Sequence, residues 1–263
     1  MVSISRTESK NLRSLSTRKG RRQLNMFAAE GVRVMEEALR HRFLPMTIYY
    51  APALLSERGR KLVTRFISAR VQVSELSARQ LQSVADTKTP QGIIGLFAMP
   101  SMDAAEQFQS SCRKVILCEG VSDPGNLGTL ARSALAFDFD ALLLIGSSVD
   151  PYSPKVVRSS AGAVFGLRIA QASLEELFEL VGRHAFKLVA SSKSGCSDIR
   201  KLKLALKSGK LILAVGSESE GLSNEILEHC DLCWEIAHST KVESLNAAVA
   251  GSIIMKQVFD YWR

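Results

Sequence analysis

Three polar segments of this sequence lie beside runs of apolar residues and contain side chains that could do chemistry. They are Glu119–Gly128, Gly216–Ser223 and Glu243–Asn246. The apolar runs predict buried strands, and in an open α/β sheet ligands bind beyond the carboxyl ends of the strands. We therefore expect the functional residues of the protein to lie in these three segments.

The first segment leads into a helical pattern with two polar side chains, Asn126 and Arg132, which are six residues apart and thus nearly two turns apart. A guanidinium that faces the loop could contact a phosphate or an oxygen nucleophile. The alternative, slightly favoured by spacing alone, is an Asn that caps the helix and an Arg that is solvated.

The other two segments are compatible with ligand binding and with plain structural roles. Glu218 and Glu220 would repel a phosphate, but they could accept hydrogen bonds from ribose hydroxyls or orient a cationic partner. An ordinary polar turn fits them equally well. Neither G-x-G-x-x-G nor a P-loop lysine is present. Ser244 and Asn246, taken alone, favour helix capping.

The positive charge of the chain is concentrated in its first hundred residues. Residues 1–100 hold 17 Lys and Arg against 7 Asp and Glu, whereas residues 101–263 hold 17 against 19. This asymmetry indicates an anionic polymer as the partner of the N-terminal part, with a solubilising surface as the alternative. No run of eighteen apolar residues exists, so the sequence predicts no membrane span.

The cysteines indicate a reducing compartment. Five cysteines without regular spacing fit free thiols in the cytoplasm. Cys230 and Cys233 form a lone CxxC, for which buried packing is favoured over zinc or redox chemistry because no second pair is near. The Ser- and Arg-rich start is not expected to be a transit peptide, since Glu8 interrupts it. We expect no metal.

Residues 1–98 predict a small, basic α/β domain, followed by a linker over residues 99–112. Met1–Gln23 reads as a short surface helix or arm. The expected helices are an amphipathic one from Phe27 to Leu39, then Leu54–Ala69 and Ser77–Val84; the expected strands are Met46–Tyr50, Val71–Val73 and Gly92–Ala98.

Residues 113–263 alternate between apolar strands and helices, which predicts a parallel sheet covered on both faces. The expected strands are Val115–Cys118, Ala141–Ile145, Lys187–Ala190, Leu211–Val215 and Cys233–Ile236. The expected helices begin at Asn126, at Ser153-Pro154, at the capping box of Ser173 and Glu176, and at Glu243, the last one running to Tyr261.

Together, the three polar segments resemble the sequence motifs of the SpoU/TrmH group of SPOUT methyltransferases. Asp123–Gly128 with Arg132 resembles motif one, Gly216–Glu218 with Gly221–Ser223 resembles motif two, and Ser244–Asn246 resembles motif three. Their order and separation also agree with that group.

Other parts of the chain extend the resemblance over most of its length. Tyr152–Gly162 is similar to the helix between the first two motifs. Ala29–Arg33 and Thr89–Ile93 look like parts of the small RNA substrate-binding domain that often precedes these enzymes.

The resemblance implies an α/β fold, a parallel-sheet SPOUT domain with a C-terminal trefoil knot, in a homodimer. It implies an RNA (ribose-2′-O)-methyltransferase that uses S-adenosyl-L-methionine on structured RNA, with ribosomal RNA ahead of transfer RNA. The positions carried over for cofactor binding are Gly216, Ile236 and Leu245. The positions carried over for the catalytic site are Asn126, Arg132, Glu218, Ser244 and Asn246.

One segment departs from the pattern of the group. Where the group has Ile-Pro-Met-x-Gly, this chain has Ile236–Thr240 and lacks both the proline and the glycine. A positive φ would be unfavourable for Thr240, which makes a non-catalytic RNA-binding paralogue the alternative function. His238 is either a new functional group or, as favoured, a surface histidine. A nucleotide-dependent oxidoreductase fits only the α/β pattern.

Overall fold

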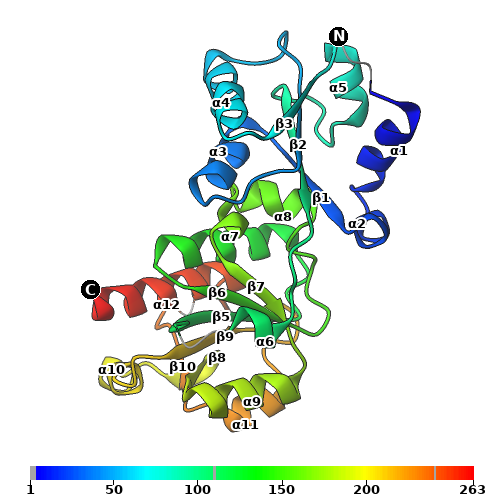
Figure 1. The fold of residues 1–263 in the computed structure, drawn as a ribbon. Helices are drawn as coiled ribbons and strands as arrows, with labels where there is room; N and C mark the ends of the chain where they lie inside the picture. Colours follow the sequence, from blue (N-terminus) through cyan, green and yellow to red (C-terminus); the bar gives the residue numbers. More distant parts are fainter. Residues whose placement is uncertain (1–3, 109–110, 240) are drawn as a thin grey trace. The chain divides into compact units, whose positions relative to one another are not determined.

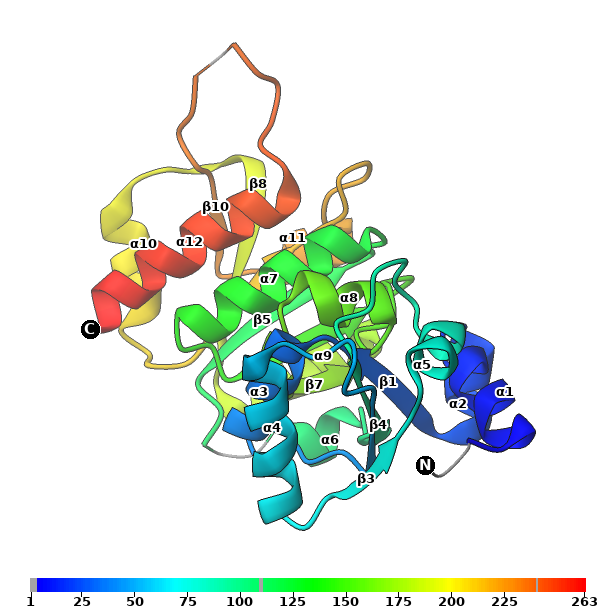
Figure 2. The same ribbon diagram turned by 90° about the horizontal axis from the view of Figure 1, so that it is seen from above.

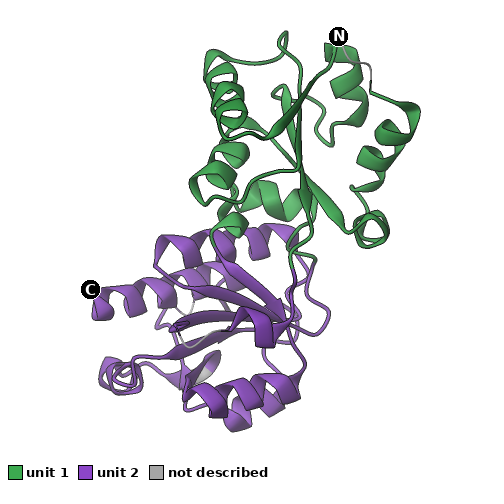
Figure 3. Cartoon of the chain, viewed as in Figure 1, with its two compact units in different colours: residues 1–100, 150–166 green, residues 101–149, 167–263 purple. Residues whose placement is uncertain are grey.

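A computed structural model describes residues 4–108, 111–239 and 241–263, and these form two compact units. Unit 1 comprises the described part of residues 1–100 together with residues 150–166, and unit 2 comprises that of residues 101–149 and 167–263 (Figure 3). The division into domains at residues 1–98 and 113–263 stays a prediction. In the packing of the structure, residues 150–166 belong to unit 1, whereas the residues before and after them belong to unit 2.

Unit 1 is built on a four-stranded mixed sheet with the strand order β1-β4-β2-β3. Strand β4 pairs antiparallel with β1 and β2, and β2 pairs parallel with β3. The strands are β1 (Met26–Glu30), β2 (Thr47–Tyr50), β3 (Gln72–Glu75) and β4 (Ile93–Ala98). The helices are α1 (Arg6–Ser14), α2 (Arg18–Leu24), α3 (Val32–Arg40), α4 (Glu57–Ser68), α5 (Ala78–Val84) and α8 (Pro154–Ser159).

The predicted helix from Phe27 to Leu39 is wrong at its start. Phe27 lies in β1, and the helix begins only at Val32, after Gly31 with φ of 107°. That backbone conformation is readily available only to glycine, and it separates the strand from the helix. The side-chain amide oxygen of Gln91 accepts the Val32 N–H at 2.9 Å. Gln91, in the segment Thr89–Ile93, thus provides a hydrogen-bond partner for an N–H group in the first turn of α3.

The segment from residue 150 to residue 166 completes the core of unit 1. The rings of Tyr152 and Phe27 have centroids 4.7 Å apart, and those of Phe165 and Phe97 are 5.0 Å apart. Arg21 is 3% exposed and forms an ion pair with Asp150, which is 13% exposed. Buried aromatic pairs and a buried ion pair bind this segment to residues that precede it by over fifty positions.

Unit 2 contains a six-stranded sheet in which all neighbouring strands are parallel, in the order β10-β8-β9-β5-β6-β7. The strands are β5 (Lys114–Glu119), β6 (Ala141–Ile145), β7 (Arg168–Gln171), β8 (Lys187–Cys196), β9 (Leu211–Val215) and β10 (Leu232–Trp234). The helices are α6 (Ala104–Gln107), α7 (Pro124–Ala136), α9 (Leu174–His184), α10 (Ile199–Leu206), α11 (Asn224–His229) and α12 (Ala247–Trp262). The predicted α/β class and parallel sheet are confirmed.

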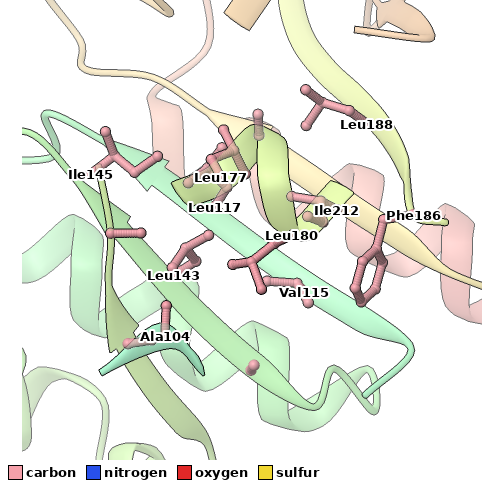
Figure 4. Close-up of a cluster of buried hydrophobic side chains, with 14 of the residues drawn as sticks. Ala104, Val115, Leu117, Leu143, Ile145, Leu177, Leu180, Phe186, Leu188 and Ile212 are labelled. Atoms are coloured by element: carbon pink, nitrogen blue, oxygen red, sulfur yellow. The ribbon is translucent and has the colours of Figure 1, made fainter. Parts of the chain in front are cut away.

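Helices cover both faces of this sheet, as its fully buried strands require. In Figures 1 and 2, α7 and α12 run along one face, and in Figure 1 α9 and α11 lie on the other. Figure 4 shows the core under α9, where Leu177 and Leu180 meet Leu117, Leu143 and Ile212 of the strands. Ala104 and Phe108 join the same core, so the predicted linker contains a short helix that packs on the sheet.

Candidate active site

The strand order of unit 2 places two of the polar segments next to each other. From β5 the chain continues to β6 and β7 on one side, whereas β9, β8 and β10 lie on the other side. Parallel sheets bind ligands where the strand order reverses in this way. The segments after β5 and β9 therefore leave the sheet side by side, and the Glu119 carboxylate accepts the Ser223 N–H at 2.8 Å.

Asn126 is not the cap of its helix, contrary to the interpretation favoured by spacing. The N-cap of α7 is Asp123, whose carboxylate accepts the Asn126 N–H at 2.9 Å, and Pro124 opens the first turn. The Asn126 side chain is thereby released from capping, and its Nδ2 donates to Glu218 Oε1 at 2.7 Å.

Asn246 combines the two roles that the sequence left as alternatives. It is the N-cap of α12, which begins at Ala247 rather than at Glu243, and its Oδ1 accepts the N–H groups of Ala248 and Val249 at 3.0 and 3.2 Å. Its Nδ2 donates to Glu218 Oε1 at 2.5 Å and to Asn126 Oδ1 at 3.1 Å. One end of the amide starts the helix while the other joins the polar segments.

Asn126, Glu218 and Asn246 thus form a hydrogen-bonded triad, although they are 92 and 28 residues apart in sequence. A single carboxylate oxygen accepts an N–H from each of the two amides. Charge-assisted hydrogen bonds of this kind are the stronger ones in proteins. The triad links three segments that are far apart in the sequence, and it fixes their relative position at the site.

A cavity of about 460 Å³ opens beside the triad, within the size range of small-molecule sites. Its lining includes three positions predicted for cofactor binding and three predicted for catalysis: Gly216, Ile236, Leu245, Glu218, Ser244 and Asn246. Gly216 is buried here, and a Cβ on it would lie 2.1 Å from the Gly221 carbonyl. Only glycine allows that approach, so the floor of the cavity depends on it.

The charged groups that line the cavity favour a cationic ligand. They are Glu218, Glu220 and Glu235 against Lys193, a formal charge of −2 when His238 is left out. A phosphate-bearing nucleotide would be repelled by this lining. The balance of charges along the lining therefore disfavours the nucleotide-dependent oxidoreductase and suits a ligand that carries a sulfonium and an ammonium group.

One wall of the cavity was missed by the sequence interpretation. Strand β8 continues past Ala190 to Cys196, and Ser191, Ser192 and Lys193 line the cavity. Lys193 also forms an exposed ion pair with Glu243 at 3.1 Å. The signal was available, because a polar run follows apolar residues here as it does in the three recognised segments.

Arg132 forms no hydrogen bond or ion pair with the triad, all of whose members are described residues. It lies on α7, its side chain is exposed, and it makes no hydrogen bond or ion pair with the residues that the structure describes. It is also absent from the cavity lining. Its catalytic role stays a prediction.

The altered segment before α12 is an open loop at the cavity. His238 lines the cavity, and its Nδ1 lies 2.8 Å from the Ile236 carbonyl oxygen. Thr240, for which we expected an unfavourable φ, lies outside the described residues. No described residue between 236 and 246 has a positive φ.

The lone CxxC forms a close thiol pair at the start of β10. Cys230 Sγ and Cys233 Sγ are 3.2 Å apart, and burial together with the neighbouring Cys233 raises the pKa of the Cys230 thiol. Across the described ranges, no group of three or more His, Cys, Asp or Glu could hold a metal ion. Of the helices described, none is both long and apolar enough to span a bilayer.

Two family matches together account for most of the chain. Residues 113–256 match the SpoU rRNA Methylase family, and residues 7–95 match the MRM3-like substrate binding domain. A relative in Bacillus subtilis, the 23S rRNA (guanosine(2553)-2'-O)-methyltransferase RlmP, is 30% identical over 249 residues, which are 94% of this chain and 93% of the relative.

Solved structures of similar proteins agree with the fold along the whole chain. The SpoU methyltransferase AviRb from Streptomyces viridochromogenes, in complex with AdoMet, is 26% identical with a TM-score of 0.84, covering 97% of this chain and 98% of that one. An AdoMet-bound rRNA methyltransferase from Sinorhizobium meliloti is 25% identical with a TM-score of 0.86, covering 100% and 98%. This chain belongs to the SpoU rRNA methylase family.

Proposed function

We propose that this protein transfers a methyl group from S-adenosyl-L-methionine to a ribose 2′-hydroxyl of ribosomal RNA. The observation that carries the proposal is the hydrogen-bonded triad of Asn126, Glu218 and Asn246 at the edge of an acidic cavity. The name of RlmP supports ribosomal RNA as the substrate, and the two AdoMet complexes support the cofactor.

The cavity fits the cofactor in size and charge. Gly216, Ile236 and Leu245 would hold it through their backbone groups, and the excess of carboxylates would favour its net positive charge. When bound, S-adenosyl-L-methionine supplies a methyl group activated by a sulfonium. Ser244 lines the same cavity and, with Glu218 and Asn246, would hold the ribose in line for the transfer.

The ribose 2′-hydroxyl is a poor nucleophile until its proton leaves to water, and a cation near it favours that loss by stabilising the negative oxygen that remains. We assign this role to Arg132, whose guanidinium would stabilise the developing alkoxide. An arginine stays protonated in proteins, and electrostatic stabilisation requires less of it than acting as a base. Asn126 would orient Arg132 or a phosphate of the RNA. Exclusion of water would speed the step, because opposite charges cancel as the methyl group moves.

A homodimer and a C-terminal trefoil knot belong to the same proposal. On α12, Ile254 and Val258 are buried within the chain, whereas Val249 is 47% exposed and Ile253 is 36% exposed. Those two exposed apolar side chains, together with an Arg132 that has no partner in the described chain, support a second copy beside α7 and α12. The cytoplasm is the proposed location, where five free cysteines stay reduced.

Unit 1 would bind the RNA backbone through its exposed cations. Helices α1 and α2 present six exposed basic side chains for which the described residues provide no ion pair: Arg6, Lys10, Arg13, Arg18, Lys19 and Arg22. Replacing Lys10, Lys19 and Arg22 by Gln should weaken RNA binding and make it less dependent on salt, while cofactor binding is unchanged. Equal RNA affinity at equal salt would remove unit 1 from the interface.

The decisive experiment uses the full chain, labelled S-adenosyl-L-methionine and an unmodified 23S ribosomal RNA transcript. We expect label in the RNA and a single ribose that resists alkaline cleavage on its 3′ side. Calorimetry with the cofactor separates the enzyme from the non-catalytic alternative. Absence of cofactor binding, or binding without transfer to any ribosomal RNA, would refute the proposed activity.

A further inference from the structure

The most basic surface of unit 2 is helix α10, which the three motifs do not include. Residues 199–210 hold five Lys and Arg and no acidic residue. The rest of unit 2 holds 10 Lys and Arg against 18 Asp and Glu. A helix of this charge on an otherwise acidic unit is a local positive surface that favours an anionic partner.

The cations of α10 lie along its outward side. Leu202 and Leu206 are buried, four residues apart, and fix the inward side of the helix. Arg200, Lys203 and Lys207 are exposed and follow the spacing i, i+3, i+7, which places them on one stripe along the helix. At 1.5 Å per residue, this stripe extends about 10 Å along the helix.

Two of these cations have no internal use. The ammonium groups of Lys203 and Lys207 are exposed and make no hydrogen bond or ion pair with any described residue. Arg200, in contrast, is held by the Asp198 carboxylate at 2.8 Å. No described carboxylate therefore neutralises Lys203 or Lys207, and their charges are available to a partner.

We infer that the outward stripe of α10 is a second RNA-binding surface, on unit 2, which contacts the phosphate backbone. The inference rests on the proposed function, because the substrate is the polyanion. Helix α10 follows directly from β8, the strand whose Ser191, Ser192 and Lys193 line the cavity. RNA held on this stripe is thus bound by the element that continues the cavity wall.

A lipid surface is the competing partner for a basic helix, and the pattern of α10 disfavours it. Membrane-surface helices bury a continuous apolar side in the lipid. The apolar side of α10 is used by the core, and only Ile199, 44% exposed, and Leu204, 66% exposed, remain outside. Isolated cations suit phosphates on a strand better than insertion into a bilayer.

The test compares two double variants of the full chain that remove the same charge. The stripe variant combines Lys203→Gln with Lys207→Gln. The control variant combines Arg183→Gln with Lys256→Gln, whose cations form ion pairs with Glu179 on α9 and Asp260 on α12. Binding to the unmodified 23S ribosomal RNA transcript is measured at increasing KCl. Each phosphate contact contributes about 0.7 to 0.9 to the slope of log K against log salt.

We expect the slope of the stripe variant to be shallower by about 1.4, which is about 0.7 for each of the two lysines. If the variant and the unchanged protein bind equally at about 1 M KCl, the variant should bind roughly 25-fold more weakly at about 0.1 M KCl. The control variant should differ little from the unchanged protein. Acetylation of the unchanged protein provides a measurement without variants: bound RNA should protect Lys203 and Lys207 but not Lys256. Equal slopes for the two variants, or no protection, would overturn the inference.

Two further measurements separate this inference from the proposed activity. Methyl transfer by the unchanged protein to the same transcript tests the activity alone. A slope that depends on the stripe, without methyl transfer, would support RNA binding by α10 and refute the proposed activity. Vesicles of phosphatidylcholine and phosphatidylserine test the lipid alternative. Stripe-dependent binding to vesicles without protection by RNA would assign α10 to a membrane surface instead.

Discussion

The double role of Asn246 allows a pair of substitutions to separate helix capping from the triad. Asn246→Asp keeps the side-chain oxygen that accepts the N–H groups of Ala248 and Val249, but it replaces the amide donor by a second carboxylate oxygen. Asn246→Ala removes both the cap and the donor. If capping is the only role, the aspartate variant should behave as the unchanged protein does.

The expected magnitudes follow from the contacts. Aspartate caps a helix as well as asparagine does, whereas alanine costs about 1 kcal/mol. The new carboxylate would face Glu218 Oε1, which accepts an N–H from Asn246 at 2.5 Å. Both side chains are exposed, so the two carboxylates can move apart to about 4 Å, where their repulsion in water is about 1 kcal/mol. The stability of Asn246→Asp should therefore change by about 1 kcal/mol at most.

Activity should respond far more strongly than stability. A shift of reacting groups by about 1 Å can lower a rate roughly 100-fold, and repulsion would push Glu218 away from its present position. We expect Asn246→Asp to lose about that factor in kcat/KM while Tm falls by about 2 to 4 °C or less.

The assay is methyl transfer from labelled cofactor to the 23S transcript, with thermal unfolding measured on the same samples. An Asn246→Asp variant with unchanged kcat/KM would show that the contact with Glu218 has no role in the reaction. A variant that loses activity only in proportion to its stability would equally refute the reasoning.

Three further predictions concern other parts of the chain. Arg132→Ala should abolish methyl transfer with a stability change within about 0.5 kcal/mol, because the side chain is exposed; retained transfer would remove it from the mechanism. Arg21→Ala should cost about 3 to 5 kcal/mol in urea unfolding, since it leaves Asp150 without its buried partner, whereas the exposed neighbour in Arg22→Ala should cost about 0.5 kcal/mol or less. Burial raises the pKa of the Cys112 thiol from an ordinary 9.0 to about 11, so the unfolded chain ionises first and stability should fall as pH rises through that interval. Cys112→Ala should flatten this part of the profile of unfolding free energy against pH; an identical slope would contradict the assignment.

Most of the sheet in unit 2 was predictable because its strands are short, apolar and separated by clear helix starts. The strands Ala141–Ile145 and Leu211–Val215 were expected with these bounds, and Ser153 and Ser173 cap α8 and α9 as predicted. Local rules suffice when the signal and its structural effect lie within a few residues.

One error at the site could have been avoided from the sequence, whereas the grouping of the site residues needed three-dimensional information. Spacing favoured Asn126 as a cap, but Asp123 is the residue that caps α7. Pro124 after Asp123 is the same helix-start signal that Pro154 gives after Ser153, and it was overlooked. The contact of Asn126 with Glu218 joins positions 92 residues apart, and only the strand order brings them together. The family resemblance supplied this grouping where local rules could not.

The strand predicted as a helix at Phe27 shows the same limit in unit 1. The spacing of Phe27, Val32 and Leu39 fits a helix, yet β1 pairs with β4 about seventy residues later, from Met26 with Ala98 to Glu30 with Ile94. Long-range pairing outweighed local periodicity at that position.

The return of residues 150–166 to unit 1 has a consequence for how the protein can be taken apart. Tyr152, Asp150 and Phe165 supply ring contacts and a carboxylate that the first hundred residues need. A fragment ending at residue 98 would expose Phe27 and Phe97 to water and leave Arg21 without its counter-charge. The first hundred residues therefore cannot be fused to another catalytic domain on their own. Such a fusion protein must also contain residues 150–166, or the surface of unit 1 that these residues cover must be redesigned.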